Sequence, residues 1–161
     1  MTKRIDPATL PVVTGTLYPS PFDEPCRSRQ RTRLADAAGL TQYGVNLVRL
    51  PPGAWSSQRH WHIAQDEFVY VVSGEVTLVT DAGAETLRVG ACAGFKAGDE
   101  NGHHLQNRST GDATFLEMGT RPPDDGAHYS DIDMMAPARA QPAQYCRRDG
   151  TPYPPQERRG A

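Results

Sequence analysis

The sequence is poor in several features that assign a chain to a specialised class of protein. It has three cysteines, which lie far apart: Cys26, Cys92 and Cys146. They form no Cys-x-x-Cys pair, so they predict neither a disulfide framework nor a structural zinc site. Three reduced thiols are typical of a cytoplasmic protein, which is the location we expect.

Long apolar segments and an excess of basic charge are also missing. The longest apolar run, residues 68–72, has five residues, far short of the roughly 20 that span a membrane. The N-terminal residues have no apolar stretch after their first charges, so we expect no secretory signal. Seventeen Lys and Arg stand against nineteen Asp and Glu, which argues against electrostatic nucleic-acid binding. We therefore expect neither a membrane nor a nucleic acid as partner.

Glycine and proline, by contrast, are plentiful, with 15 and 14 residues among 161. Such frequent turn formers favour short strands over long helices. The segments that carry strand-like residues between turn signals are 45–50, 67–72, 76–80, 85–89, 91–95, 103–107 and 113–118. The chain has the length of one domain, so the sequence predicts an all-β sandwich or barrel.

The segments that flank the β-rich core of residues 41–120 have a different composition. Residues 1–40 carry five prolines and predict an extended N-terminal arm, with one helical turn that ends at Gly39. Residues 121–161 are rich in Pro, Asp and Arg and predict a C-terminal strap over the barrel. The expected anchors of this strap include Tyr129, Met134 and Tyr145.

A basic patch lies within the N-terminal arm. Its arginines alternate with other residues: Arg27, Arg29, Arg31 and Arg33. We interpret the patch as a solvated strand or loop face, with contact to an anion or a partner as the alternative.

Four of the five histidines fall in two clusters, His60-Trp61-His62 and His103-His104. Residues i and i+2 of a strand share a face, so His60 and His62 project side by side. Glu67 opens the next apolar strand, where a carboxylate is costly unless it is paired or binds a cation. Imidazoles with one carboxylate suit Fe(II), Mn(II), Ni(II), Cu(II) or Zn(II), so the pattern predicts one divalent transition metal.

These residues resemble the two sequence motifs of the cupin family. The first motif is matched by Gly53-(x6)-His60-x-His62-(x4)-Glu67-(x6)-Gly74, with one additional residue after the first glycine. The second motif is matched by Gly90-(x5)-Lys96-Ala97-Gly98-(x4)-His103-(x3)-Asn107, with lysine in place of a proline and two extra residues before the histidine. Residues 102–109 also resemble small single-domain bacterial cupins.

The resemblance implies a double-stranded β-helix, that is, a cupin or jelly-roll barrel with its metal inside one mouth. The metal ligands that it implies are His60, His62, Glu67 and His103. His103 is preferred over His104 because only His103 is followed by Asn107 four residues later. We expect His104 to face away as a hydrogen-bonded residue near the rim, with a pocket or proton-transfer role as the alternative.

Two further residues are candidates for the catalytic pocket. Arg49 could clamp a substrate carboxylate, although we expect an outward salt bridge. Tyr70 could act as a phenolic acid, although we expect it to pack in the core or at an interface. The apolar face of Phe68, Tyr70 and Val72 needs cover, which we expect from a homodimer partner or the terminal arms. His128 lies outside both motifs and is expected at the surface.

The ligand set implies a metalloenzyme, and analogy with the family supplies its activities. We expect an Fe(II)-type dioxygenase that acts on a small anionic or aromatic substrate. Three imidazoles and one carboxylate leave open positions and a net positive charge on an octahedral divalent ion. The alternatives are a non-redox isomerase or lyase with Zn, Ni or Mn, and a protein that binds a small ligand without turnover. The fold does not decide among them.

Overall fold

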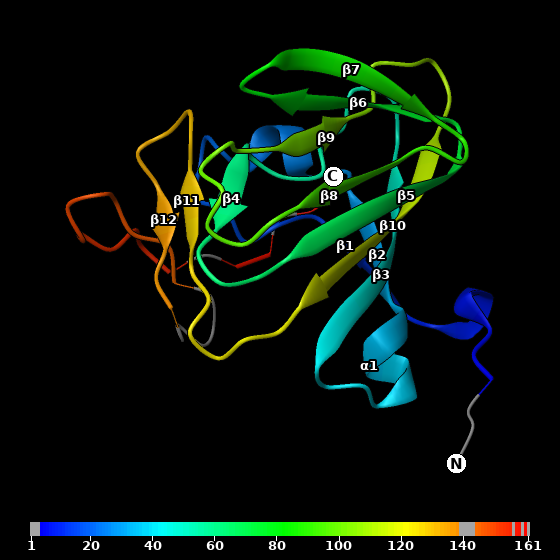
Figure 1. Ribbon diagram of the computed structural model, residues 1–161, viewed down its shortest axis with the longest axis horizontal. Helices are drawn as coiled ribbons and strands as arrows, with labels where there is room; N and C mark the ends of the chain where they lie inside the picture. The colour runs from blue at the N-terminus through cyan, green and yellow to red at the C-terminus, as the bar shows by residue number, and fades with distance from the viewer. Residues whose placement is uncertain (1–3, 139–143, 156, 159, 161) are drawn as a thin grey trace.

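Three antiparallel β-sheets make up most of the regular structure (Figure 1). The computed structural model describes residues 4–138, 144–155, 157, 158 and 160. The strands are β1 (Val12–Thr14), β2 (Gln30–Arg33), β3 (Tyr43–Leu50), β4 (His60–His62), β5 (Glu67–Ser73), β6 (Glu75–Thr80), β7 (Gly83–Arg88), β8 (Cys92–Phe95), β9 (His104–Gln106), β10 (Ala113–Thr120), β11 (Ala127–Tyr129) and β12 (Met135–Ala136). The helical elements are α1 (Leu34–Ala38) and the 3₁₀ turns η1 (Pro7–Thr9) and η2 (Glu24–Cys26). Among the residues that the structure describes, no helix has the length and apolar character that a membrane span needs.

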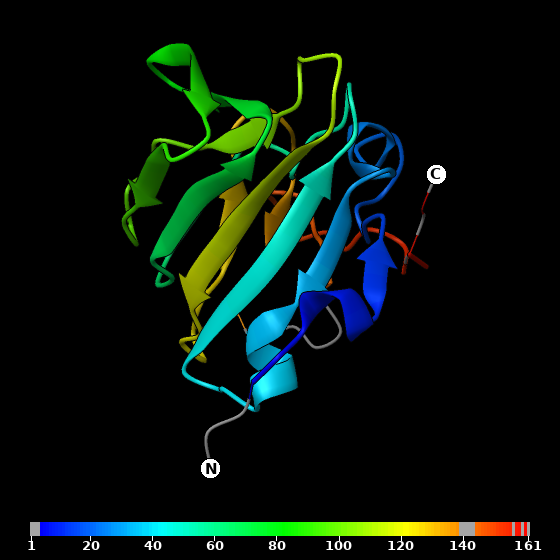
Figure 2. The ribbon, with the colours of Figure 1, turned by 90° about the vertical axis from the view of Figure 1, so that its right-hand side faces the viewer.

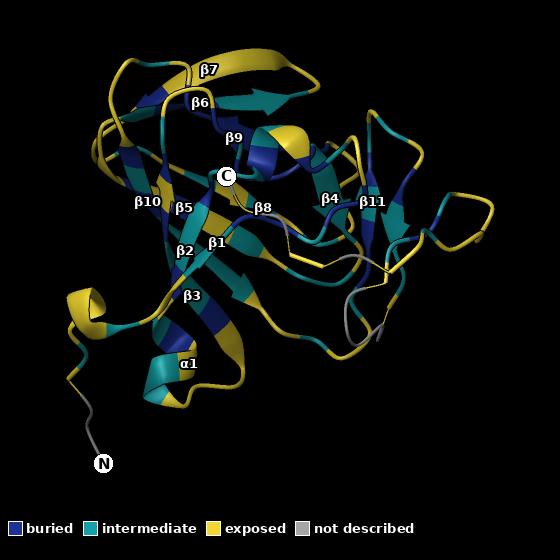
Figure 3. Ribbon diagram, turned by 180° about the vertical axis from the view of Figure 1, so that it is seen from behind, coloured by how far each residue is buried: buried dark blue, intermediate teal, exposed yellow. Residues whose placement is uncertain are grey.

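The sheets enclose the core as the walls of a jelly-roll barrel, which confirms the predicted fold class. The six-stranded sheet has the order β1-β2-β3-β10-β5-β8, and its strands lie side by side in Figure 2. The sheet β7-β6-β9 covers one face of the core, and β12-β11-β4 closes one end. The core lies between the six-stranded sheet and the sheet β7-β6-β9. Its fully buried side chains include Val48, Val71 and Phe115 from the former and Val76 from the latter. The outermost strand, β7, is exposed except at Leu87 (Figure 3).

All seven predicted strands are present, with boundaries that differ by at most two residues. The turn between β5 and β6 shows why a motif glycine is needed there. Gly74 has a φ of 68°, and a Cβ at this position would collide with the backbone carbonyl of Asp112. The glycine that ends the first motif therefore serves the hairpin, and the hairpin in turn positions β5.

The segments predicted as arms contribute strands to the barrel. β1 and β2 extend the six-stranded sheet at one edge, and the predicted helical turn is confirmed as α1, which ends at Gly39 with a φ of 77°. The C-terminal strands β11 and β12 pair with β4, so that Ala127 lies opposite His62 and Tyr129 opposite His60. Both ends of the chain thus build the walls around the histidine strand.

A second apolar cluster holds the C-terminal segment against the N-terminal one. Tyr18 and Cys26 pack there with Tyr129 and Met134, all of them buried, and Tyr145 is partly buried beside them. The ring of Tyr18 lies 5.5 Å from that of Tyr129 and 5.3 Å from that of Tyr145. The expected anchors of the strap are therefore confirmed.

The outer face of β5 is open in a single chain. Phe68, Tyr70 and Val72 are 41 %, 42 % and 43 % exposed, so the described parts of the terminal arms do not cover them. A homodimer partner on this face stays a prediction. The three cysteines are unpaired, as expected.

Candidate metal centre

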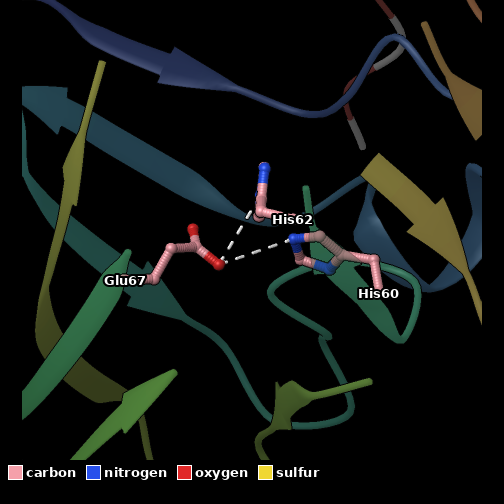
Figure 4. A group of neighbouring side chains, drawn as sticks. All are labelled: His60, His62 and Glu67. Atoms are coloured by element: carbon pink, nitrogen blue, oxygen red, sulfur yellow. Dashed lines mark ion pairs between the residues drawn. The ribbon is translucent and has the colours of Figure 1, made fainter. Parts of the chain in front are cut away.

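Two histidines of β4 and the first residue of β5 converge on one point (Figure 4). His60 and His62 alternate with Trp61, whose ring stacks instead on the half-buried His128 with the centroids 4.7 Å apart. Glu67 Oε2 lies 3.8 Å from His60 Nε2 and 3.6 Å from His62 Nε2. These three residues form a group with the geometry to hold a metal ion.

His103 approaches the same carboxylate from the neighbouring segment. Its backbone forms an antiparallel bridge with His60 through N–H···O bonds of 3.1 and 2.8 Å. His103 Nε2 lies 3.0 Å from Glu67 Oε2, and its ring stacks flat on Phe95 with the centroids 3.5 Å apart. The structure thus places the fourth expected ligand beside the other three, and its role as a ligand stays a prediction.

The charge state of this cluster suits a divalent cation. Burial alone would raise the pKa of Glu67, but His103, His60 and His62 outweigh burial and lower the pKa to about 2. Burial lowers the pKa of His60 to about 3, which leaves its ring neutral at pH 7. Glu67 Oε2 is buried without a well-formed hydrogen bond from any described residue. An ionised carboxylate that faces imidazole nitrogens is the donor chemistry of a transition metal, so the residues present fit one.

Second hydrogen bonds orient the histidine rings. His62 Nδ1 lies 2.7 Å from Asp125 Oδ2, while Asp125 Oδ1 accepts bonds of 3.0 Å from the backbone N–H groups of Ala64 and Gln65. His60 Nδ1 lies 3.0 Å from the carbonyl oxygen of Gln58. Because the Nδ1 atoms are engaged, both rings direct Nε2 toward Glu67, as metal-binding histidines require.

The ring of His104 lies between Ser57, Gln106 and Trp55 and not against Glu67. It is only 4 % exposed, with Nδ1 2.9 Å from the carbonyl oxygen of Ser57 and Nε2 2.9 Å from Gln106 Nε2. Its ring packs edge-on against Trp55. Burial lowers its pKa to about 4, so the imidazole is neutral at pH 7. Both ring nitrogens of His104 are thus engaged by groups outside the ligand cluster, and a pocket or proton-transfer role for it stays a prediction.

Arg49 and Tyr70, the other two candidates, lie outside the barrel interior. Arg49 pairs with Asp112 and donates a 2.9 Å bond to Gln30, so it makes the outward salt bridge that we expect. Tyr70 points outward from β5 among the exposed apolar residues. Neither side chain is among the described residues that line the two cavities at the candidate ligands.

The metal centre instead opens into a cavity of about 540 Å³ with an arginine-rich wall. The arginines that line it are Arg29, Arg31, Arg33, Arg121 and Arg158. Arg29 is only 7 % exposed, so the interpretation of the basic patch as a solvated face is wrong for this residue. The strand alternation that places Arg31 and Arg33 on one face turns that face inward. An anionic ligand suits such a wall.

A second, smaller cavity of about 190 Å³ borders the other side of the ligand cluster. His62, Glu67 and His103 contribute to its wall, together with the apolar side chains of Leu78 and Phe95. The candidate ligands therefore stand between two spaces of different size and polarity.

Comparison with known proteins agrees with this geometry. The family profile described as the Cupin domain matches residues 46–119. Among solved structures, the chain is similar to a sugar phosphate isomerase of the cupin superfamily from Silicibacter pomeroyi. The two are 46% identical with a TM-score of 0.90, over 94% of this chain and 97% of the other. The chain belongs to the cupin superfamily.

Two further solved structures resemble this cupin in their overall fold. One, from Acidithiobacillus ferrooxidans and named for the same activity, is 26% identical, with a TM-score of 0.68 over 88% of this chain and 83% of the other. A polyketide cyclase from Streptomyces resistomycificus is 18% identical, with a TM-score of 0.65 over 82% and 87%, and shows the fold alone. No curated protein matches this cupin.

Sequence reasoning missed several residues that shape the site of this cupin. Asp125 lies in the C-terminal segment, outside both motifs, and only the pairing of β11 with β4 brings it near His62. Glu117 lines the large cavity from β10, where it looks like any polar residue of an alternating strand. The one feature of the sequence that could have indicated the arginine wall is the run of alternating arginines at residues 27–33, and this pattern also fits a solvent-exposed face.

Proposed function

We propose that this cupin is a metal-dependent isomerase that acts on a small, hydroxylated, anionic substrate. The observation that carries the proposal is one cavity shared by a metal-binding cluster and five arginines. Its volume of about 540 Å³ is in the range of small-molecule sites. The name of the similar Silicibacter pomeroyi protein, a sugar phosphate isomerase, supports the same class of reaction.

A divalent metal held by His60, His62, Glu67 and His103 would supply Lewis-acid polarisation of a substrate carbonyl or hydroxyl. The arginines neutralise and orient the anionic group, because guanidinium groups bind oxyanions through paired N–H donors. Glu67 compensates part of the metal charge, so the net charge of the site still favours an anion.

Glu117 is the other carboxylate among the described residues that line the cavity, and we assign proton transfer to it. It removes a proton from the carbon beside the carbonyl and returns it to the former carbonyl carbon, while the hydroxyl proton passes between the two oxygens. Arg31 Nη2 lies 3.0 and 3.1 Å from the two carboxylate oxygens of Glu117, and Asn46 Nδ2 donates a 3.0 Å bond to Oε1. These contacts hold the base in place, and the reaction needs no oxidant.

The test is to incubate the metal-loaded protein with phosphorylated aldoses and ketoses in deuterated water, without oxygen. We expect interconversion that leaves deuterium on the carbon that receives the proton, with Zn, Ni or Mn as the metal. Glu117→Gln lowers kcat by roughly 100-fold or more and leaves the metal content unchanged. Absence of interconversion with every metal tried, or turnover that depends on oxygen, overturns the proposal.

A dioxygenase is the second candidate function, and the smaller cavity favours it. This space borders the same ligands and has room for a small molecule such as dioxygen. Its wall combines the apolar side chains of Leu78, Ala93 and Phe95 with polar ones, among them Lys96 and Asp99. The chain would then hold Fe(II) and act on an anionic or aromatic substrate. Oxygen uptake that matches substrate loss in the Fe(II)-loaded protein supports this candidate, and turnover without oxygen excludes it.

A further inference from the structure

We infer that Arg29, Arg31 and Arg158 form a subsite for a phosphoryl group at the end of the cavity remote from the metal ligands. The inference rests on the proposed function in one respect, because it names the anionic group of a substrate that uses the same cavity. The subsite itself is inferred from hydrogen bonding and charge balance at the arginine wall, independently of the reaction at the metal centre.

Two of these guanidinium groups converge without a counter-ion. Arg29 Nη2 donates a 3.1 Å bond to the carbonyl oxygen of Gly15, and Arg158 Nη1 donates a 3.0 Å bond to the same oxygen. Arg29 also donates to the carbonyl oxygen of Ser56. Within the described chain, neither arginine forms an ion pair with a carboxylate. Two like charges that meet at one carbonyl repel each other, and an anion between them would relieve that repulsion.

Unused donors are available beside this pair. The Nε–H groups of Arg29 and Arg31 are buried and have no hydrogen-bond partner among the described residues. Buried donors are rarely left unpaired in a folded protein, so these two indicate a missing acceptor. Burial, followed by the charge of Arg31, lowers the pKa of Arg29, as expected for a cation that lacks its anion.

The number of charges points to a phosphoryl group in preference to a carboxylate. Glu117 is the one carboxylate paired with these three arginines among the described residues, so two positive charges are uncompensated. A phosphate monoester carries nearly two negative charges at pH 7 and three acceptor oxygens, whereas a carboxylate carries one charge. Arg33 and Arg121 differ because both pair with Asp36, at 3.8 and 2.5 Å, so their charges are partly neutralised.

The order of the strands places this subsite at a useful distance from the metal ligands. Across the six-stranded sheet, Arg31 lies on β2, Asn46 on β3, Glu117 on β10 and Glu67 on β5, one residue on each successive strand. Strands are about 4.8 Å apart, so β2 and β5 are separated by roughly 14 Å across the sheet. In the observed register Arg31 lies in line with Val71, four residues along β5 from Glu67, which adds to the separation. A substrate held by its phosphoryl group at β2 would therefore present its other end to the metal and pass Glu117 between them.

The subsite can be tested without turnover, by titrating inorganic phosphate, sulfate and acetate into the metal-free, full-length protein by calorimetry. We expect phosphate and sulfate to bind at one site per chain, and acetate to bind at least about tenfold more weakly. Arg158→Gln weakens phosphate binding by about tenfold or more. The matched control is Arg88→Gln, which removes an exposed arginine of β7 and leaves phosphate binding unchanged.

Arg158 is exposed, and among the described residues it donates a hydrogen bond to the carbonyl oxygen of Gly15, so we expect its replacement to permit folding, which the melting temperature verifies. Loss of phosphate binding in Arg158→Gln with unchanged metal content supports the subsite even where isomerase activity is absent, because binding and turnover are measured separately. No phosphate binding, equal losses in Arg158→Gln and Arg88→Gln, or equal affinity for acetate and phosphate overturns the subsite, whatever reaction the metal centre catalyses.

Discussion

The two ends of the large cavity are built in opposite ways. At the metal end, His60, His62 and Glu67 come from consecutive strands joined by a short loop. At the arginine end, Arg29 and Arg31 come from the N-terminal segment and Arg158 from the last residues of the chain. The metal ligands lie close together in the sequence, so their spacing forms a recognisable motif. The arginines come from both ends of the chain, so no sequence motif joins them.

The ends also differ in how they carry charge. Histidine and glutamate titrate, and their neighbours shift their pKa values, so the metal end responds to pH. Guanidinium groups stay charged in proteins, so the arginine end is a permanent positive wall. Perturbing one end should therefore leave binding at the other end nearly intact, and four experiments test that separation.

The largest expected effect comes from Glu67→Gln. The amide removes the only negative charge among the expected ligands, so the metal content falls from about one ion per chain to nearly none. Elemental analysis measures the loss, and sulfate binding at the arginine end persists. Glu85→Gln, an exposed carboxylate on β7, is the control and retains the metal. Full metal content in Glu67→Gln would contradict the ligand assignment.

Asp125→Asn should have a smaller effect at the same end. Asparagine keeps the Oδ1 acceptor for the loop N–H groups but replaces the oxygen that faces His62 Nδ1. Loss of such a supporting carboxylate weakens metal binding by about 10- to 100-fold. Competition with a fluorescent chelator measures this affinity. The neighbouring exposed carboxylate gives the control, Asp124→Asn, and equal affinities in both variants would exclude the supporting role.

Lowering the pH should weaken metal binding at one end of the cavity and leave anion binding at the other end unchanged. Burial opposes protonation of His62, but the carboxylates of Asp125, Glu67 and Glu117 together outweigh burial and raise the pKa of the ring. Below that raised pKa a proton competes with the metal, so metal affinity falls as the pH is lowered from about 7.5 to 5.5, by about tenfold for each unit below the pKa. In the metal-free protein, the same shift stabilises the fold below the ordinary histidine pKa, and the gain is lost as pH rises through the raised value.

Sulfate is the control for the pH experiment, because both sulfate and the guanidinium groups keep their charge over this range. Its affinity should change by less than about threefold while metal affinity falls. Parallel losses of metal and sulfate binding would show that the two ends are not independent.

The smallest effect is expected from Arg49→Gln. Its pair with Asp112 lies on the outer surface, so its loss changes the free energy of unfolding by at most about 1 kcal/mol. Metal and sulfate binding should match the unchanged protein, since Arg49 contacts neither end of the cavity. Weaker binding of metal or sulfate in Arg49→Gln would show that Arg49 contributes to ligand binding in the cavity.

The seven core strands were predictable because each is a short run of β-forming residues between glycine or proline turns. The strands of the terminal segments were not. All four residues of β2 are polar, so it has no apolar alternation, and β11 is three residues long. Such strands form because neighbouring strands offer hydrogen bonds and a buried face, which single-segment propensity does not reveal.

The functional site divides in the same way. The choice of His103 over His104 could be made from the position of Asn107, whose side chain donates to the carbonyl oxygens of Leu50 and Gly111 and so anchors the end of that segment. Arg49 and Arg31 both lie within strands, the first between two apolar residues and the second between two polar ones, and neither setting shows whether the arginine faces outward or inward. Their orientations depend on which face of the sheet the rest of the chain covers.

By itself, the sequence determined the fold class and the metal-binding pattern, because turns, strand alternation and ligand spacing act over a few residues. Only the tertiary structure decided that Asp125 supports His62, that Glu117 faces the cavity and that arginines from both ends of the chain meet at Gly15. Those contacts join segments far apart in the chain, and the pairing of strands and the burial of charge that create them arise only when the barrel closes.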